Sequence, residues 1–98
     1  MKSRAKAFPP LGDGRHAVHR LAPGLLLVFK PRGHAEEPHV HAHRQTLRIL
    51  RGALRVRTTR RTQVIRPSSA PLTLAAGRRH ATEAIEDTWL VAESPRLE

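Results

Sequence analysis

The 98-residue chain contains no cysteine and no long hydrophobic run. The missing cysteine excludes disulfides and thiolate-bound metals. The most apolar stretch, residues 24–29, is too short for a membrane span, and the basic segment at the start lacks the apolar core of a secretion signal. We therefore expect a cytoplasmic protein with no membrane partner. The length predicts a single domain with one modest core.

Aromatic residues are also scarce, and acidic residues are outnumbered. Two Phe, one Trp and no Tyr leave few platforms on which single-stranded bases could stack. Eighteen Lys and Arg against eight Asp and Glu give a net charge of +10, a balance that can indicate a polyanionic partner. The arginines are scattered over many segments instead of being clustered. We therefore expect no specific nucleic-acid partner.

No segment of the chain shows a sustained helical period. Short alternating or β-branched stretches recur roughly every ten residues between Gly and Pro turns, which is typical of an all-β sandwich or barrel. Residues 1–14 are predicted to form an N-terminal arm, because Pro9 and Pro10 block regular strand pairing. The predicted strands cover residues 15–22, 25–30, 39–43, 45–50, 53–59, 62–66, 71–76, 78–86 and 89–93.

Three histidines, His39, His41 and His43, stand on alternate residues. Alternate side chains of an extended segment point to the same face, and Gln45 continues that face. Imidazole is a common protein ligand for zinc, copper, iron and nickel. The spacing, together with His80 far downstream, therefore predicts a metal site, and histidines on a solvated strand are the alternative. His43 is expected at the surface, with a place beside the ligands as the second choice.

The segment that follows the histidines has a half-buried pattern. If Gln45 faces inward, Leu47 and Ile49 also face inward and Arg48 faces solvent. The same alternation over residues 53–59 places Leu54 and Val56 on one face and arginines on the other. The remaining histidines, at positions 16, 19 and 34, show no comparable spacing and are expected to be solvated.

Glycines frame the histidine pair at regular distances. Gly33 precedes His39 by five intervening residues, one residue separates His39 from His41, and Gly52 follows after ten more. This spacing resembles the first sequence motif of the cupin superfamily, in which a Glu is usual at the position that Gln45 takes here. The motif is specific and is nearly complete in this chain.

A second motif of the same superfamily is half matched. Gly77 and His80 fall at its spacing, whereas Ser69, Ala75 and Ala84 replace its first Gly, its Pro and its Asn. The resemblance covers residues 25–95 and is to the small cupins related to sugar epimerases. It implies an all-β, single-domain cupin jelly-roll β-barrel over residues 15–98, following the arm at 1–14. It also implies a bacterial homodimer.

The resemblance further implies that a divalent transition metal, zinc, nickel, manganese or iron, is held in the barrel by His39, His41, Gln45 and His80. Ligands from segments so far apart can converge only inside a closed sheet. Three neutral nitrogens and one neutral oxygen would leave the charge of the ion uncompensated, which favours Lewis-acid chemistry. Gln45 could instead hydrogen-bond a bound water, leaving three ligands. Some cupins with eroded motifs bind no metal, which is the alternative for the whole site.

Two classes of function are compatible with such a barrel. The first is a metal-dependent isomerase, lyase or dioxygenase that acts on a small sugar-acid-like or carboxylate molecule, as the resemblance to cupins that rearrange unsaturated sugar acids implies. Glu83 and Glu93 are candidate proton carriers by position only, with a surface carboxylate as the alternative for each. Arg48 or Arg78 could meet a substrate carboxylate. The second class is a non-catalytic binding module or sensor, which the short chain and the lack of an obvious base favour.

Overall fold

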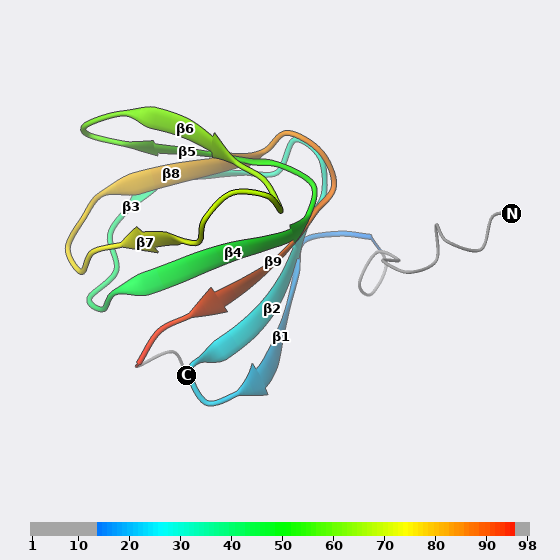
Figure 1. Cartoon of the computed structure of the whole chain (residues 1–98), viewed down its shortest axis with the longest axis horizontal. Helices are drawn as coiled ribbons and strands as arrows, with labels where there is room; N and C mark the ends of the chain where they lie inside the picture. Colours follow the sequence, from blue (N-terminus) through cyan, green and yellow to red (C-terminus); the bar gives the residue numbers. More distant parts are fainter. Residues whose placement is uncertain (1–13, 96–98) are drawn as a thin grey trace, which may run out of the picture.

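The computed structural model describes residues 14–95 and consists there of nine β-strands without a helix. Figure 1 shows the strands arranged in two layers. The strands are β1 (Ala17–Ala22), β2 (Leu25–Lys30), β3 (Ala35–His39), β4 (Gln45–Arg51), β5 (Leu54–Thr58), β6 (Thr62–Ile65), β7 (Leu72–Leu74), β8 (His80–Ala84) and β9 (Thr88–Glu93). The all-β prediction is confirmed.

The strands form two antiparallel sheets. The five-stranded sheet has the order β1-β2-β9-β4-β7, and the four-stranded sheet has the order β3-β8-β5-β6. Successive strands β3, β4 and β5 alternate between the two sheets, and so do β7, β8 and β9. This pattern is a jelly-roll sandwich, in which each sheet covers the inner face of the other.

The core lies between the two sheets and follows the predicted alternation. Leu47 and Ile49 of β4 are buried, whereas Arg48 between them is exposed. On β5, Leu54 and Val56 are both fully buried and Arg57 is exposed. Because one face of each strand is buried, a shift of one residue in register would expose the apolar set, so the hydrophobic pattern fixes the register.

Several predicted boundaries are wrong. The third strand ends at His39, so that His41 and His43 lie in the connection to β4 instead of on a continuous strand. The strand predicted over 71–76 is only the three-residue β7, and the first strand begins at Ala17. The arm predicted over residues 1–14 falls, apart from Gly14, outside the described residues.

Gly52 turns the chain from β4 into β5, and no other residue fits there. Its φ is +98°, and an added Cβ would overlap the backbone oxygen of Asp87 and the hydroxyl of Thr88. The fully buried Thr88 hydroxyl donates to the Ala53 carbonyl at 3.0 Å and accepts from the Ala53 N–H at 3.2 Å. The last glycine of the first motif therefore has a packing role that closes one end of the sandwich.

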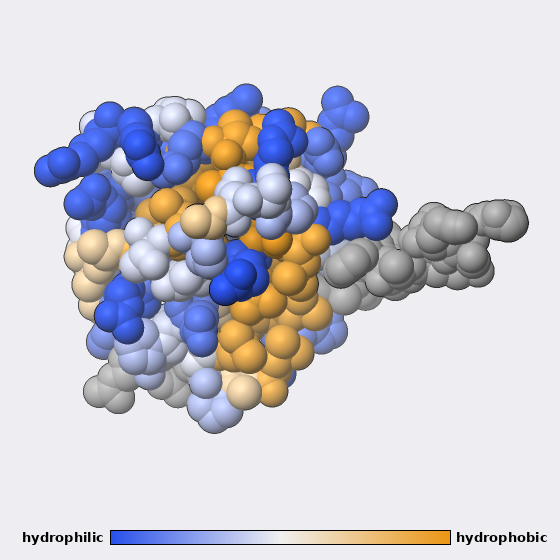
Figure 2. All heavy atoms as spheres, in the orientation of Figure 1, coloured by the Kyte–Doolittle hydropathy of each residue, from blue (hydrophilic) through white to orange (hydrophobic). Residues whose placement is uncertain are grey.

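The outer surface is mixed in character. Figure 2 shows hydrophilic side chains around the margin of the visible face and a hydrophobic region through its centre and lower right. Arg44, Arg48, Arg57 and Arg60 are among the exposed arginines and lie on several different segments. In the described part of the chain, no helix is long and apolar enough to span a membrane.

Candidate metal centre

A cavity of about 170 Å³ lies between the two sheets. Leu26, Val28, Leu54 and Leu90 contribute to its apolar wall, which also includes Val18, Leu47 and Ala92. The remaining lining is polar or ionisable and consists of His16, Lys30, Glu36, His39, His41, Gln45, His80 and Thr82. The cavity therefore has an apolar part and a part lined by polar and ionisable side chains, which are the groups that can bind a metal or a polar ligand.

An irregularity in β3 turns two of its side chains into this cavity. Glu36 pairs with Thr82 of β8, and His39 pairs with His80, so three steps along β3 match two along β8. Such a bulge shifts the alternation by one residue, and as a result Glu36 and His39 both line the cavity. Pro38 lies within the bulge on a strand at the edge of its sheet, where a missing N–H is tolerated.

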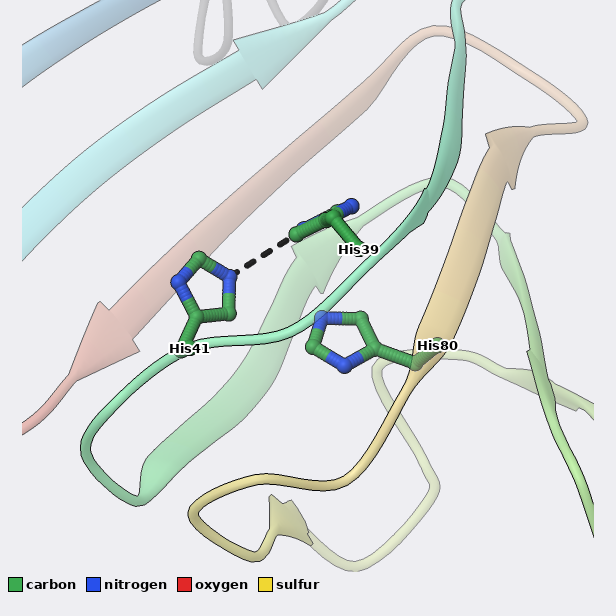
Figure 3. A group of neighbouring side chains, drawn as sticks. All are labelled: His39, His41 and His80. Carbon is green, nitrogen blue, oxygen red and sulfur yellow. Dashed lines mark hydrogen bonds between the residues drawn. The ribbon is translucent and has the colours of Figure 1, made fainter.

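His39, His41 and His80, called the three-histidine centre below, converge at one end of the cavity. Figure 3 shows the three rings directed toward one another from β3, from the connection after it and from β8. The Nε2 atoms of His39 and His41 are 3.1 Å apart. The ring centroid of His80 lies 4.6 Å from that of His39 and 5.2 Å from that of His41. One nitrogen from each ring lies within 4.8 Å of the others, so a single ion can reach all three.

Backbone carbonyls hold two of these rings in place. The Nδ1–H of His39 donates to the Glu37 carbonyl at 2.7 Å, and the Nδ1–H of His80 donates to the Arg78 carbonyl at 3.1 Å. This assignment leaves Nε2 of both rings without a proton, as in metal-binding histidines whose other nitrogen is anchored. His41 then donates its Nε2–H to His39, and an ion would take the place of that proton.

The electrostatics of the three-histidine centre also favour the metal-binding form. Burial lowers the pKa of His80, and the nearby charges of His39 and His41 lower it further against the opposing hydrogen bond to the Arg78 carbonyl. Burial likewise lowers the pKa of His41. Because only the neutral imidazole coordinates a metal, these shifts favour coordination at neutral pH. The donor set therefore fits a divalent transition metal.

The other residues singled out from the sequence lie as follows. Gln45, the first residue of β4, lines the cavity beside the histidines, and its role as a ligand stays a prediction. His43 is exposed, as expected. Arg48 is exposed and Arg78 lies in a separate surface pocket, so neither lines the cavity. Arg78 touches the three-histidine centre through its backbone carbonyl, which holds the His80 ring, and neither arginine side chain lines the cavity.

A second group of ionisable side chains, called the Glu36 cluster below, was missed by the sequence analysis. The Lys30 ammonium donates to Glu36 Oε2 at 2.8 Å, and His34 Nε2 lies 3.2 Å from the same oxygen. His16 stacks on His34 with ring centroids 4.2 Å apart, and its Nε2 lies 3.7 Å from that oxygen. His34 is half-buried, so the expectation that it is solvated is wrong, whereas His16 and His19 are exposed as expected.

The carboxylate of this cluster replaces the acidic residues expected at the site. Burial would raise the pKa of Glu36, but the hydrogen bond and charge of Lys30 and the bond to His34 outweigh burial and lower the pKa to about 2. Glu83 instead pairs with Arg55 at 2.7 Å outside the cavity, and Glu93 is exposed. Neither carboxylate lines the cavity, which agrees with the alternative that each is a surface carboxylate. The bulge at Pro38 is the local feature that could have identified Glu36.

Comparison with known proteins shows which fold the chain shares with solved structures. A scan against protein-family models finds no match, and neither does a search of curated proteins. Among solved structures, a cupin superfamily protein from Desulfitobacterium hafniense matches with a TM-score of 0.73 at 15% identity, covering 88% of each chain. KdgF from Halomonas sp. matches with a TM-score of 0.67 at 24% identity, covering 85% of this chain and 79% of its own.

An RmlC-like cupin from Shewanella frigidimarina also matches, with a TM-score of 0.65 at 15% identity, covering 89% of this chain and 90% of its own. At these identities the comparisons establish the fold. The chain has the cupin fold, and the architecture implied by the two sequence motifs is confirmed.

Proposed function

We propose that this chain is a metal-dependent cupin that acts on a small polar molecule inside its barrel as an isomerase, lyase or dioxygenase. His39, His41 and His80 would hold one divalent transition ion, with Gln45 as the candidate fourth ligand. The observation that carries this proposal is the convergence of three imidazoles, two of which are anchored through Nδ1 with Nε2 directed into the cavity.

The chemistry of the donor set supports a Lewis-acid role. Imidazole nitrogen and amide oxygen carry no charge, so the ion would keep its full positive charge for polarising an oxygen of the substrate. Zinc, nickel, manganese and iron are all candidates, and imidazole alone does not separate them. A sugar-acid-like or carboxylate substrate follows from this excess positive charge, since an anionic oxygen would compensate it.

The residues of the chain itself supply the rest of the pocket. The apolar side chains of β2, β5 and β9 exclude water from one side. Lys30 and Glu36 bring a balanced pair of charges to the polar wall. A substrate would thus lie between a cationic centre and an ion pair, with its hydrocarbon part against the apolar wall.

One observation favours a non-catalytic binding module or sensor as the second candidate. Glu36 is the one carboxylate among the described residues that lines the cavity. Its pKa of about 2 makes it a weak proton acceptor at neutral pH, whereas an efficient general base has a pKa near the working pH. A barrel that binds a metal and a small ligand without turning it over would have the same geometry.

Elemental analysis of protein purified without a metal-affinity tag tests the metal site that both candidates share. We expect close to one transition ion per chain, removable by a chelator. The double variant His39→Ala/His80→Ala should retain none, and the matched control His16→Ala/His34→Ala should retain the full amount. A metal content equal in wild type and in His39→Ala/His80→Ala would overturn the proposal.

Three further expectations stay predictions. The cupin resemblance implies a bacterial homodimer, and the cytoplasmic location stays an expectation. The exposed arginines lie on separate segments, which supports the prediction that the protein has no specific nucleic-acid partner.

A further inference from the structure

The Glu36 cluster has hydrogen-bonding capacity that residues 14–95 do not use. The hydrogen bonds and ion pairs that Lys30, His34 and His16 make to Glu36 all fall on one carboxylate oxygen, Oε2. The other carboxylate oxygen, Oε1, accepts no hydrogen bond from residues 14–95. Oε1 is therefore an open acceptor on a side chain that lines the cavity.

Open donors lie on the same wall. Lys30 is 7% exposed, and Glu36 is its one hydrogen-bond partner within the described residues, which leaves two ammonium N–H groups unused. Thr82, which faces Glu36 across the β3–β8 pair, has a buried hydroxyl without a partner in the described part of the chain. A buried hydroxyl without a hydrogen bond is uncommon, because desolvation costs free energy that nothing compensates.

We propose that Lys30, Glu36 and Thr82 form a subsite for a hydroxyl group of the ligand that the three-histidine centre holds. A hydroxyl can donate to Glu36 Oε1 and accept from Lys30 at the same time. A second carboxylate would be repelled by Glu36, and an ammonium group would be repelled by Lys30. A neutral group that both donates and accepts is thus the best match, and this inference rests on the proposed function.

The dimensions of the cavity limit the rest of the ligand. An apolar cavity of about 150 Å³ is enough to hold benzene, and this cavity measures about 170 Å³. The apolar part of its wall includes Val28, Leu54 and Leu90. The ligand class is therefore a short-chain hydroxy acid, with its carboxylate at the three-histidine centre, a short hydrocarbon middle and its hydroxyl at Lys30 and Glu36.

Two acids of equal size test the subsite on zinc-loaded protein. The probes are 4-hydroxybutyrate and pentanoate, which differ by a hydroxyl in place of a methyl group, and their dissociation constants are measured by NMR titration. We expect wild type to prefer 4-hydroxybutyrate by about tenfold, since a site with charged hydrogen-bonding groups discriminates against an analogue that lacks the hydroxyl. Lys30→Met/Glu36→Leu removes both charges together, so this variant should bind the two acids about equally.

Two variants control for indirect effects. Thr82→Val keeps the Lys30–Glu36 pair and should reduce the preference to about threefold, which tests the subsite even if the double variant does not fold. Glu83→Gln removes a carboxylate that is paired with Arg55 outside the cavity and should keep the full preference. Zinc content is measured on every sample, so a loss of the metal centre is separated from a loss of the subsite.

The outcomes are distinct. A wild-type preference below about twofold, no binding of either acid to zinc-loaded protein, or an unchanged preference in both Lys30→Met/Glu36→Leu and Thr82→Val would overturn the subsite and leave the metal centre standing. Wild-type protein that binds none of zinc, nickel, manganese and iron would overturn the proposed function, and the subsite inference with it. If the protein binds one of these ions but not zinc, the titrations use that ion.

Discussion

The two ends of the cavity's polar wall offer similar ligands but differ in charge. The three-histidine centre and the Glu36 cluster each bring three potential metal-ligating atoms within 4.8 Å of one another. The first has neutral nitrogens and no acid. The second has a carboxylate, and the Lys30 ammonium already lies 2.8 Å from it. A cation is therefore already present in the Glu36 cluster, whereas the three-histidine centre has none.

The hydrogen bonds make the same distinction. In the three-histidine centre, backbone carbonyls hold Nδ1 of two rings and leave Nε2 toward the cavity. In the Glu36 cluster, His34 points its Nε2 at the carboxylate oxygen that Lys30 also binds, so this nitrogen is engaged within the cluster. Ligand type alone would favour the Glu36 cluster as a two-histidine, one-carboxylate iron site. Charge and hydrogen bonding favour the three-histidine centre instead.

The largest expected effect is stabilisation by zinc. Free zinc at a hundred times its dissociation constant should raise the free energy of unfolding by about 2.7 kcal/mol, which corresponds to about 10–20 °C in Tm for a domain of this size. The gain should disappear in His39→Ala/His80→Ala and persist in His16→Ala/His34→Ala, as measured by calorimetry. A gain that disappears in the second variant and persists in the first would place the ion in the Glu36 cluster and reverse the comparison.

The next effect concerns the ion pair. Lys30→Met leaves Glu36 half-buried without its ammonium partner, and we expect a loss of about 2 kcal/mol at pH 7, below the figure for a fully buried pair because the carboxylate side chain is 33% exposed. Urea unfolding measures the loss. Lys30→Met/Glu36→Leu should recover most of it, since no charge is then left unpaired. If Lys30→Met is as stable as wild type, the Lys30–Glu36 pair contributes nothing to the free energy of unfolding.

The same ion pair makes the stability of the protein depend on pH in the acid range. Its carboxylate has a folded pKa of about 2 against an ordinary value of 4.5. A pKa that is lowered by folding gives stability that is fully present above pH 4.5 and is lost as the pH falls through 2. Over that window, wild type should lose about 1 kcal/mol more than Lys30→Met/Glu36→Leu, after allowance for solvent screening. Equal acid dependence in the two proteins would contradict the lowered pKa.

These contrasts also show what could be predicted from sequence. The fold and the three histidines follow from short-range spacing, because His39 and His41 share one motif and His80 stands in another. The Glu36 cluster cannot be predicted from sequence spacing in this way. Strict alternation would place Glu36 and His39 on opposite faces, and only the bulge at Pro38 brings both inside. Lys30 ends an apolar run, and its partner Glu36 is recognisable only once β3 is placed.

A smaller effect is expected at Gln45. If its amide oxygen is a ligand, Gln45→Glu adds a negative charge to the three-histidine centre and makes it more similar to the Glu36 cluster. The ratio of manganese to zinc affinity should then rise by about tenfold, or about 1.4 kcal/mol, because carboxylate oxygen suits harder ions. Competition titrations measure the ratio, and Gln63→Glu on β6, away from the cavity, is the matched control. An unchanged ratio would remove Gln45 from the ligands.

The smallest effect is expected at Thr82, which lies on β8 opposite Glu36 and two residues after His80. Its hydroxyl is buried and has no hydrogen-bond partner among the described residues, so removing it should cost the empty protein nothing. Thr82→Val keeps the β-branched shape and removes one unsatisfied polar atom, and we expect a change between zero and about 1 kcal/mol of stabilisation in urea unfolding without ligand. Ala81→Val on the same strand is the control for a change in side-chain volume. It should destabilise the protein, because Ala81 is buried.

A loss of more than about 1 kcal/mol in Thr82→Val would mean that the hydroxyl has a partner within the fold. That result would remove Thr82 from the hydroxyl subsite and leave Lys30 and Glu36 as the groups that distinguish this end of the cavity from the three-histidine centre.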